Sequence, residues 1–310
     1  MAANPPLAVG GHTVKARTSS HHAVRLAQRD PAIVRNLLVI SVVLLMSVLV
    51  ILPVAMVFLE AFWKGPQVYF EKLFQDPDTL HSIQLTLTVA PIAVAANVLF
   101  GLAAAWLIAR FKFPGRSLLI TVIDLPFAVS PVVAGLMFVM IFGRMGLLGP
   151  FLLPHGIKII NALPGLILVT TFVTLPFVVR ELIPVMEAIG SEEEVAAVNL
   201  GANAWQIFWS ITLPNIKWGL LYGIILCNAR AMGEFGAVYV VSGRVSGQTL
   251  TMPLQVNFLY ESGDMVGSYA VASLLTFLAL ISLAVKVWLE RLTSMELADA
   301  ARSQEGTQTP

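Results

Sequence analysis

Residues 37–59 read LLVISVVLLMSVLVILPVAMVFL, and the whole run contains no charged side chain. A helix needs about 20 apolar residues, each adding ~1.5 Å, to cross the hydrocarbon core of a bilayer. This run has that length, and it has no polar face that could be turned toward water. It therefore predicts a membrane-spanning helix over residues 36–60 rather than an element of a water-soluble core.

The composition of the whole chain supports the same prediction. Of the 310 residues, 57% are hydrophobic and 12% are charged, whereas a water-soluble domain carries about 25% charged residues. We therefore expect an all-α, polytopic membrane bundle of six transmembrane helices. The five further spans are expected at Ile83–Ala109, Leu118–Phe142, Leu163–Val179, Ile216–Val241 and Gly267–Leu289.

Both ends of the chain are expected on the cytoplasmic side. Residues 1–35 are largely polar and basic, which is typical of a retained, disordered tail rather than of a cleaved signal peptide. If this tail is cytoplasmic, 13 of the 19 Lys and Arg residues lie in the inner flanks of the spans, five lie in the outer flanks, and Arg230 lies inside a span. Because Lys and Arg accumulate on the cytoplasmic side, residues 290–310 are predicted to form a second cytoplasmic tail.

The longest inner loop carries an informative local pattern, SEEEVAAVNLG, over residues 191–201. Ser191 and Glu194 have the spacing of a capping box, and three glutamates in the first turn complement the helix dipole. Gly201 is placed to end the helix in a left-handed conformation. A helix of about nine residues is marginal alone in water, so another surface must stabilise it.

A second short helix is predicted from Asn203, as its N-cap, through Ile211, with Pro214 opening the fifth span. Ala196 and Ala197 give the first helix a surface of small side chains, which another backbone could approach closely. The alternative is an ordinary connector helix that lies against its own bundle. The local pattern alone does not separate these two interpretations.

The spacing of this loop resembles the EAA loop of permease subunits of bacterial ABC importers. The matching residues are Ala196-Ala197, Gly201 after three residues, and Ile211-Thr212-Leu213-Pro214 after nine more. The resemblance implies the type I importer permease fold, a permease domain over residues 82–289, and a coupling loop over residues 190–214 that binds a cytoplasmic ATPase. The implied coupling residues are Ser191, Glu194, Ala196, Ala197, Gly201, Ile211, Leu213 and Pro214. The family glutamate falls at Val195 here, which leaves open whether Glu194 makes the charged contact with the ATPase.

A second resemblance concerns the substrate. Residues 228–238, NARAMGEFGAV, look like the fifth span of sulfate and molybdate permeases, and VVSG at 240–243 with TMPLQ at 251–255 resembles the CysW type of sulfate/thiosulfate permease. The implied activity is ATP-driven import of sulfate or thiosulfate across the bacterial inner membrane by alternating access, with molybdate or tungstate as the alternative. The implied partners are two copies of an ATPase, a second permease subunit, a periplasmic anion-binding protein and the lipid bilayer, and no nucleic acid.

Charged residues inside the predicted spans are candidates for the translocation path. Arg230 and Glu234 lie four residues apart, so on one helix they can pair. An arginine at this depth costs about 2.5–3.5 kcal/mol or more, and such residues are usually functional. The pair either stabilises the bundle or lines the path of a divalent anion. Asp124 is a further candidate, as gate, packing residue or counterpart of Arg230, because Pro126 and Pro131 are expected to bend its helix.

Two other classes of protein are less well supported. An ion-coupled secondary transporter could use the three charged residues named above, but it leaves the EAA-like loop unexplained. A membrane enzyme would need a nucleophile–base pair or a cluster of metal ligands, and the spans show neither, so no catalytic residue, metal or cofactor is predicted. The sequence has no G-x-x-x-x-G-K-[ST] motif, so in an ATP-driven transporter another chain must bind the nucleotide.

Overall fold

The computed structural model describes the backbone of residues 32–307 and the side chains of residues 33–291. Every regular element in this part of the chain is a helix, which confirms the all-α prediction. The chain divides into two units, residues 1–56 and 57–310. Most of the predicted N-terminal tail, residues 1–31, lies outside the described residues.

Helix α2 (Ala32–Ala61) contains the first predicted span. Its most apolar window has a mean hydropathy of 3.1, and its large apolar side chains between Ile33 and Leu52 are exposed. An exposed surface that is apolar on every face is stable in lipid and not in water. The helix therefore has the properties expected of a membrane span.

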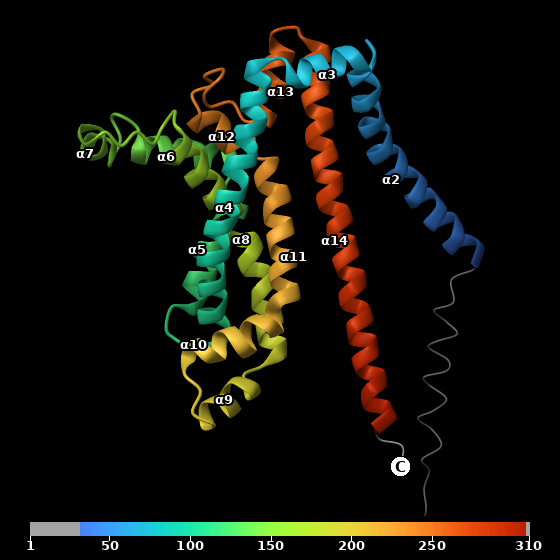
Figure 1. Ribbon diagram of the computed structural model, residues 1–310, viewed down its shortest axis with the longest axis vertical. Helices are drawn as coiled ribbons and strands as arrows, with labels where there is room; N and C mark the ends of the chain where they lie inside the picture. The colour runs from blue at the N-terminus through green and yellow to red at the C-terminus, as the bar shows by residue number, and fades with distance from the viewer. Residues whose placement is uncertain (1–31, 308–310) are drawn as a thin grey trace, which may run out of the picture. The chain divides into compact units, whose positions relative to one another are not determined.

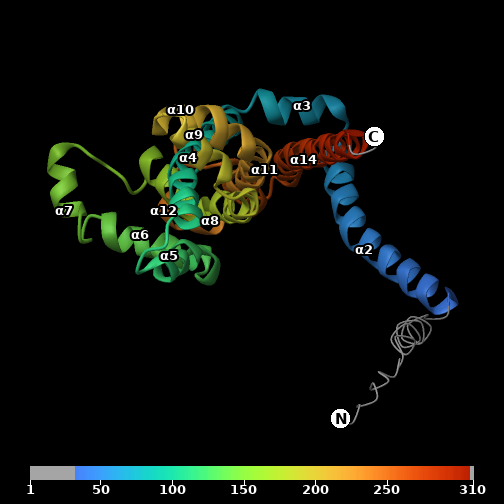
Figure 2. The ribbon, with the colours of Figure 1, turned by 90° about the horizontal axis from the view of Figure 1, so that it is seen from below.

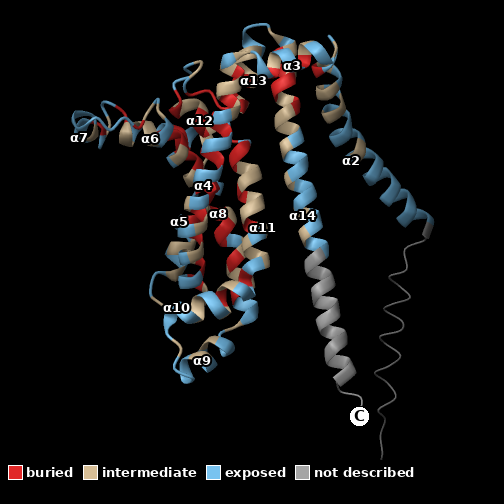
Figure 3. Cartoon of the chain, in the orientation of Figure 1, coloured by how far each residue is buried: buried red, intermediate tan, exposed pale blue. Residues whose placement is uncertain are grey.

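Three long helices form the centre of the second unit: α4 (Pro77–Arg110), α8 (Leu163–Ile189) and α11 (Leu213–Met232). They lie side by side in Figure 1, and Figure 3 shows buried residues concentrated where they face one another. Val178 and Leu182 of α8 have no exposed surface in this cluster. The largest core of the unit is thus made of the spans themselves.

Two spans extend furthest beyond their predicted C-terminal ends. Helix α8 continues through Pro176 and Pro184 to Ile189, because prolines are tolerated in a buried span when neighbouring groups satisfy the freed carbonyls. Helix α14 (Met265–Thr307) continues far beyond the expected end at Leu289, into the predicted C-terminal tail. It packs against α11 and against α13 (Met252–Glu261).

The third predicted span is bent rather than straight. It consists of α5 (Arg116–Ala128) and α6 (Pro131–Phe142), which meet at an angle of 109°. The expected bend at the two prolines is confirmed, and the described residues contain five single helices long enough to span a membrane, or six spans when the bent pair counts as one. Figure 2 shows α6 and α7 (Gly149–Leu152) reaching away from the central helices; the 3₁₀ helix η1 (Leu153–His155) follows them.

The fifth predicted span, Ile216–Val241, is wrong as one continuous helix. Helix α11 ends at Met232, three residues have no helical structure, and α12 (Gly236–Val241) follows. Gly233 weakens the helix at this point because glycine has the highest conformational freedom in the unfolded chain. The break places Arg230 in the last turn of α11 and Glu234 outside regular structure.

Short helices cover the two ends of the central helices. At one end, here called the α9 end, lie α9 (Glu192–Asn199), α10 (Ala204–Ile207) and the π-helical segment η2 (Phe208–Thr212), and Figure 1 shows them below the long helices. At the opposite end, here called the α3 end, lie α13 and α3 (Pro66–Phe74).

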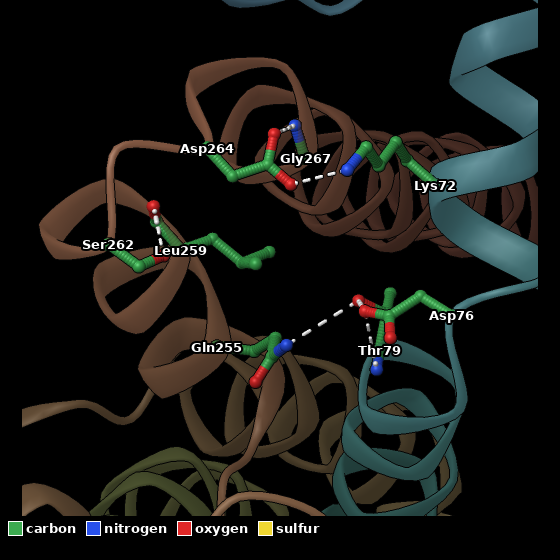
Figure 4. A network of polar contacts seen from close by, with 8 residues as sticks. All are labelled: Lys72, Asp76, Thr79, Gln255, Leu259, Ser262, Asp264 and Gly267. Carbon is green, nitrogen blue, oxygen red and sulfur yellow. Dashed lines mark hydrogen bonds and ion pairs between the residues drawn. The ribbon is translucent and has the colours of Figure 1, made fainter.

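A polar network joins helices at the α3 end (Figure 4). Lys72 of α3 pairs with Asp264, with 2.7 Å between Nζ and Oδ2, and the N–H of Gly267 donates to the other carboxylate oxygen at 3.1 Å. Nearby, Asp76 accepts from the N–H of Thr79 and caps α4. Partial burial raises the pKa of Asp264, but the hydrogen bonds from Lys72 and Gly267 outweigh this effect and lower it. The hydrogen bond to Asp264 raises the pKa of Lys72.

Candidate functional site

Helix α9 begins where it was predicted to begin, but not by the predicted mechanism. Ser191 precedes the helix and its side chain makes no capping hydrogen bond, so the proposed capping box is wrong. The carboxylate of Glu194 does not return to the start of its own helix. Instead, its Oε1 accepts a hydrogen bond from Arg110 at 3.0 Å and another from the hydroxyl of Thr212 at 2.9 Å.

The C-terminal end of α9 has the predicted geometry. Gly201 has φ +88°, the left-handed conformation. Its N–H donates to the carbonyl of Val198 at 2.9 Å, and the N–H of Ala202 donates to that of Ala197 at 3.0 Å. These two hydrogen bonds are those of a Schellman motif, and they satisfy carbonyls that the helix itself leaves without donors.

The second short helix is correctly predicted at its start. Asn203 accepts from the N–H of Gln206 and the Gln206 side chain accepts from the N–H of Asn203, both at 2.9 Å. This is a complete capping box, and the sequence spacing Asn-x-x-Gln could have revealed it. This second helix was expected to be separate from the fifth span. Instead, α10, η2 and α11 follow one another without a gap. Pro214 lies in the first turn of α11, as expected.

The α9 end presents an apolar surface. Val195, Val198 and Leu200 are 55%, 58% and 89% exposed, and Trp205 of α10 is 71% exposed. Ala196 is exposed and Ala197 is half-buried. A groove of about 460 Å³ runs between α9, α10 and the end of α4. Its lining consists of Trp106, Phe111, Ser191, Glu194, Val195, Val198, Ala204, Ile207, Phe208 and Thr212.

The expected pair of charges in the fifth span is present at the break between α11 and α12. Arg230 and Glu234 approach to 2.7 Å, and their side chains are 35% and 1% exposed. The other oxygen of Glu234 accepts from the N–H of Ala237 at 3.0 Å, in the first turn of α12. The carboxylate therefore neutralises a cation and satisfies the start of the next helix at the same time.

Asp124 does not contact Arg230. Its carboxylate pairs with Arg180 of α8 at 2.8 Å, and the guanidinium of Arg180 lies 4.7 Å from the centre of the Phe127 ring. Asp124 and Arg180 are among the residues that line a cavity of about 220 Å³ between α4, α5 and α8. Asp124 is thus part of a separate charged pair.

Comparison with known proteins identifies the family. The family described as "Binding-protein-dependent transport system inner membrane component" matches residues 97–294. The chain belongs to this family. The permease is also 51% identical over 259 residues to the sulfate transport system permease protein CysW of Escherichia coli (strain K12), a match that covers 83% of this chain and 89% of that protein.

Two other matches extend this result. The CysW protein of Synechocystis sp. is 48% identical over 260 residues, covering 84% of this permease and 94% of that protein. A solved bacterial ABC transporter involved in the import of alginate superposes with a TM-score of 0.64 at 20% identity, over 85% of this chain and 97% of that chain. The latter match shows that the permease has the fold of an ABC importer membrane chain.

Several residues at these sites were not predicted. Arg110 and Thr212 lie 84 and 18 positions from Glu194, and Arg180 lies 56 positions from Asp124. No local pattern in the sequence of the permease connects residues so far apart. Only the packing of α4 and η2 against α9, and of α5 against α8, brings them together.

Proposed function

We propose that this chain is the membrane-spanning permease subunit of an ATP-driven importer for sulfate or thiosulfate. Its membership of the family and its 51% identity to a sulfate transport system permease support the substrate class. The observation that carries the mechanism is the short helix α9, whose apolar side chains are exposed beyond the ends of the spans. Exposed apolar patches of this kind mark protein interaction sites.

The partner at the α9 end is a cytoplasmic ATPase, present in two copies. The exposed side chains Val195, Val198 and Leu200 offer an apolar surface for a cleft on that protein. No P-loop occurs in this chain, so the energy of ATP hydrolysis must come from a partner. The distribution of Lys and Arg supports a cytoplasmic location for both termini.

Two further partners complete the importer. A second, similar permease chain encloses the path together with this one, and a periplasmic binding protein delivers the anion at the α3 end. A solved relative of the fold is described in complex with an alginate pentasaccharide-bound periplasmic protein. Closure of the ATPase moves α9, and the spans then alternate between inward- and outward-facing arrangements.

The break between α11 and α12 is the proposed contact with the substrate. Arg230 is the cation at this break, and it keeps 35% of its side chain exposed. Its pairing with Glu234 weakens the positive field, which suits a path where the anion must bind and leave again. The roles of Arg230 and Glu234 differ from that of Asp124, whose partner Arg180 is itself 57% exposed.

The coupling role of α9 is tested with the substitution Gly201→Asp. A residue with a β-carbon at φ +88° is strained by about 1–2 kcal/mol, and the new charge lies on the proposed interface. We expect copurification of the ATPase and anion uptake in reconstituted vesicles to be lost. Uptake is measured with labelled sulfate, thiosulfate and molybdate, with and without ATP.

The matched control is Gly263→Asp at the α3 end. Gly263 has φ +85°, and, like Gly201, it has no neighbour within 4 Å of an added β-carbon. The strain is therefore the same, but the position is remote from α9. Retained copurification in Gly201→Asp, or equal loss in both variants, contradicts docking at α9. Uptake by the permease alone under an ion gradient contradicts ATP-driven transport.

A further inference from the structure

The most buried ion pair at the α9 end lies behind the exposed surface rather than on it. Arg110, at the end of α4, donates to Glu194 of α9 at 3.0 Å and to the backbone carbonyl of Met186 in α8 at 2.9 Å. Thr212, at the start of α11, donates to the same oxygen of Glu194 at 2.9 Å. We call these four residues the α9 junction.

The α9 junction differs from the other ion pairs of the described residues in its burial. The side chains of Arg110 and Glu194 are 10% and 16% exposed. In each of the other pairs at least one side chain is a quarter exposed or more, as in Arg116–Glu187 at 40% and 48%. Half-exposed pairs contribute little because water screens them, whereas charged hydrogen bonds away from water are stronger.

The α9 junction is a buried polar link between α9 and the spans; α9 also has an exposed link to α11, in which Asn215 donates to Glu193 at 2.6 Å. Met186 lies in the last turn of α8, where carbonyls have no donor within the helix. Nη1 of Arg110 donates to this carbonyl, and Nη2 of the same guanidinium donates to Glu194. One side chain therefore connects α9 to the ends of α4 and α8, while Thr212 connects the same carboxylate to α11.

We propose that the α9 junction transmits the movement of α9 to the spans, with Arg110 and Glu194 as positioning residues for coupling. This inference rests on the proposed function. Glu194 is turned inward and does not bind the ATPase, which instead meets the exposed apolar side chains of α9. When α9 moves, the shared carboxylate moves the ends of α4, α8 and α11 together, so ATP hydrolysis is converted into rearrangement of the path.

The test separates coupling from docking. The complex of this permease with its ATPase, second permease chain and binding protein is reconstituted with Glu194→Ala, which removes both hydrogen bonds of the carboxylate. We expect the ATPase to copurify and hydrolyse ATP as before, while anion uptake per ATP falls about tenfold, the scale of one charged hydrogen bond. Arg110→Ala should give the same phenotype, and the double variant should be no worse than either single one.

The matched control is Glu192→Ala, which removes an exposed carboxylate from the same turn of α9. It should keep wild-type uptake per ATP. Glu194→Gln is nearly isosteric and keeps an acceptor, so its uptake per ATP should lie between those of wild type and Glu194→Ala. This variant replaces Glu194→Ala in the test if the alanine variant unfolds.

Three results overturn the inference: wild-type uptake per ATP in Glu194→Ala and Glu194→Gln, loss of ATPase copurification in both, or additive losses in the double variant. These differ from failure of the proposed function, in which the wild-type chain itself neither binds an ATPase nor needs ATP for uptake.

Discussion

Two carboxylates in this permease have the same local role in different surroundings. Glu234 accepts from the N–H of Ala237 at the start of α12 and pairs with Arg230. Asp264 accepts from the N–H of Gly267 at the start of α14 and pairs with Lys72. In both cases one oxygen satisfies a helix start and the other binds a cation on a different helical segment.

The difference between the two pairs is burial. Glu234 is 1% exposed, whereas Asp264 is 30% exposed and Lys72 is 41% exposed. Removing one member of a buried pair leaves a charge without water or partner, but removing one member of an exposed pair lets water replace it. The same combination of a hydrogen bond to a helix start and an ion pair is therefore essential at the α11–α12 break and only supportive at the α3 end.

The largest effect is expected from Arg230→Ala. The substitution leaves the Glu234 carboxylate buried without its cation, which costs about 3 kcal/mol or more. The anion also loses its cationic contact. Anion uptake in vesicles should therefore fall at least about tenfold, because a loss of roughly 1.4 kcal/mol in interaction free energy corresponds to a tenfold change. Thermal unfolding of the purified complex in detergent measures the loss of stability separately.

The double variant Arg230→Ala/Glu234→Ala removes both charges and should recover assembly but not uptake. Glu187→Ala is the control, since the ion pair of Glu187 with Arg116 is about half exposed and should contribute less than about 1 kcal/mol. Normal transport by Arg230→Ala would contradict a functional role for the pair. Equal losses of stability in Arg230→Ala and in the control variant would show that burial does not determine how much an ion pair contributes.

An intermediate effect is expected from Asp264→Ala. This variant loses the hydrogen bond to Gly267 at the start of α14, worth about 1 kcal/mol, and a half-exposed ion pair, worth about 0.2–1 kcal/mol. The midpoint of thermal unfolding should fall while uptake per ATP stays at the wild-type value. A loss of uptake as large as that of Arg230→Ala would contradict the comparison.

The smallest effect is in the pH dependence of stability. The pKa of Asp264 is lowered from 3.8 in the folded protein, so its contribution is complete above the unfolded value and is lost as the pH falls through the folded value. The pKa of Lys72 is raised from 10.5, so its contribution is complete below that value and is lost as the pH rises through the folded value. Asp264→Asn, which can still cap α14, should therefore destabilise at pH 7 and become equal to wild type only when the pH has fallen below the lowered folded pKa of Asp264. An unchanged difference between the two proteins at low pH would contradict this assignment.

The sequence predicted the number and positions of the spans better than their continuity. Hydropathy located α2, α4, α8 and α14, because a lipid-exposed or buried apolar run has a distinctive length. Hydropathy did not locate the breaks between α5 and α6 and between α11 and α12, because the sequence stays apolar where each helix is interrupted. The prolines indicated the first of these breaks, but Gly233 alone did not indicate the second.

The candidate site also contains some features that the sequence predicted and others that it did not. Local geometry was predictable where it depends on neighbouring residues: the left-handed Gly201, the N-cap Asn203 and Pro214 in the first turn of α11. The partner of Glu194 was not predictable, because Ser191 three residues earlier offered an equally good local contact. Arg110 and Thr212 bind the carboxylate instead, and only folding brings them near.

By itself, the sequence determined that this chain is a helical membrane protein with a capped, exposed segment between its fourth and fifth spans. Apolar length, proline and glycine act over a few residues, so their consequences can be read along the chain. The tertiary structure alone decided which charges pair and how deeply each pair is buried. Those outcomes depend on contacts between helices far apart in sequence, and burial sets how much each contact contributes.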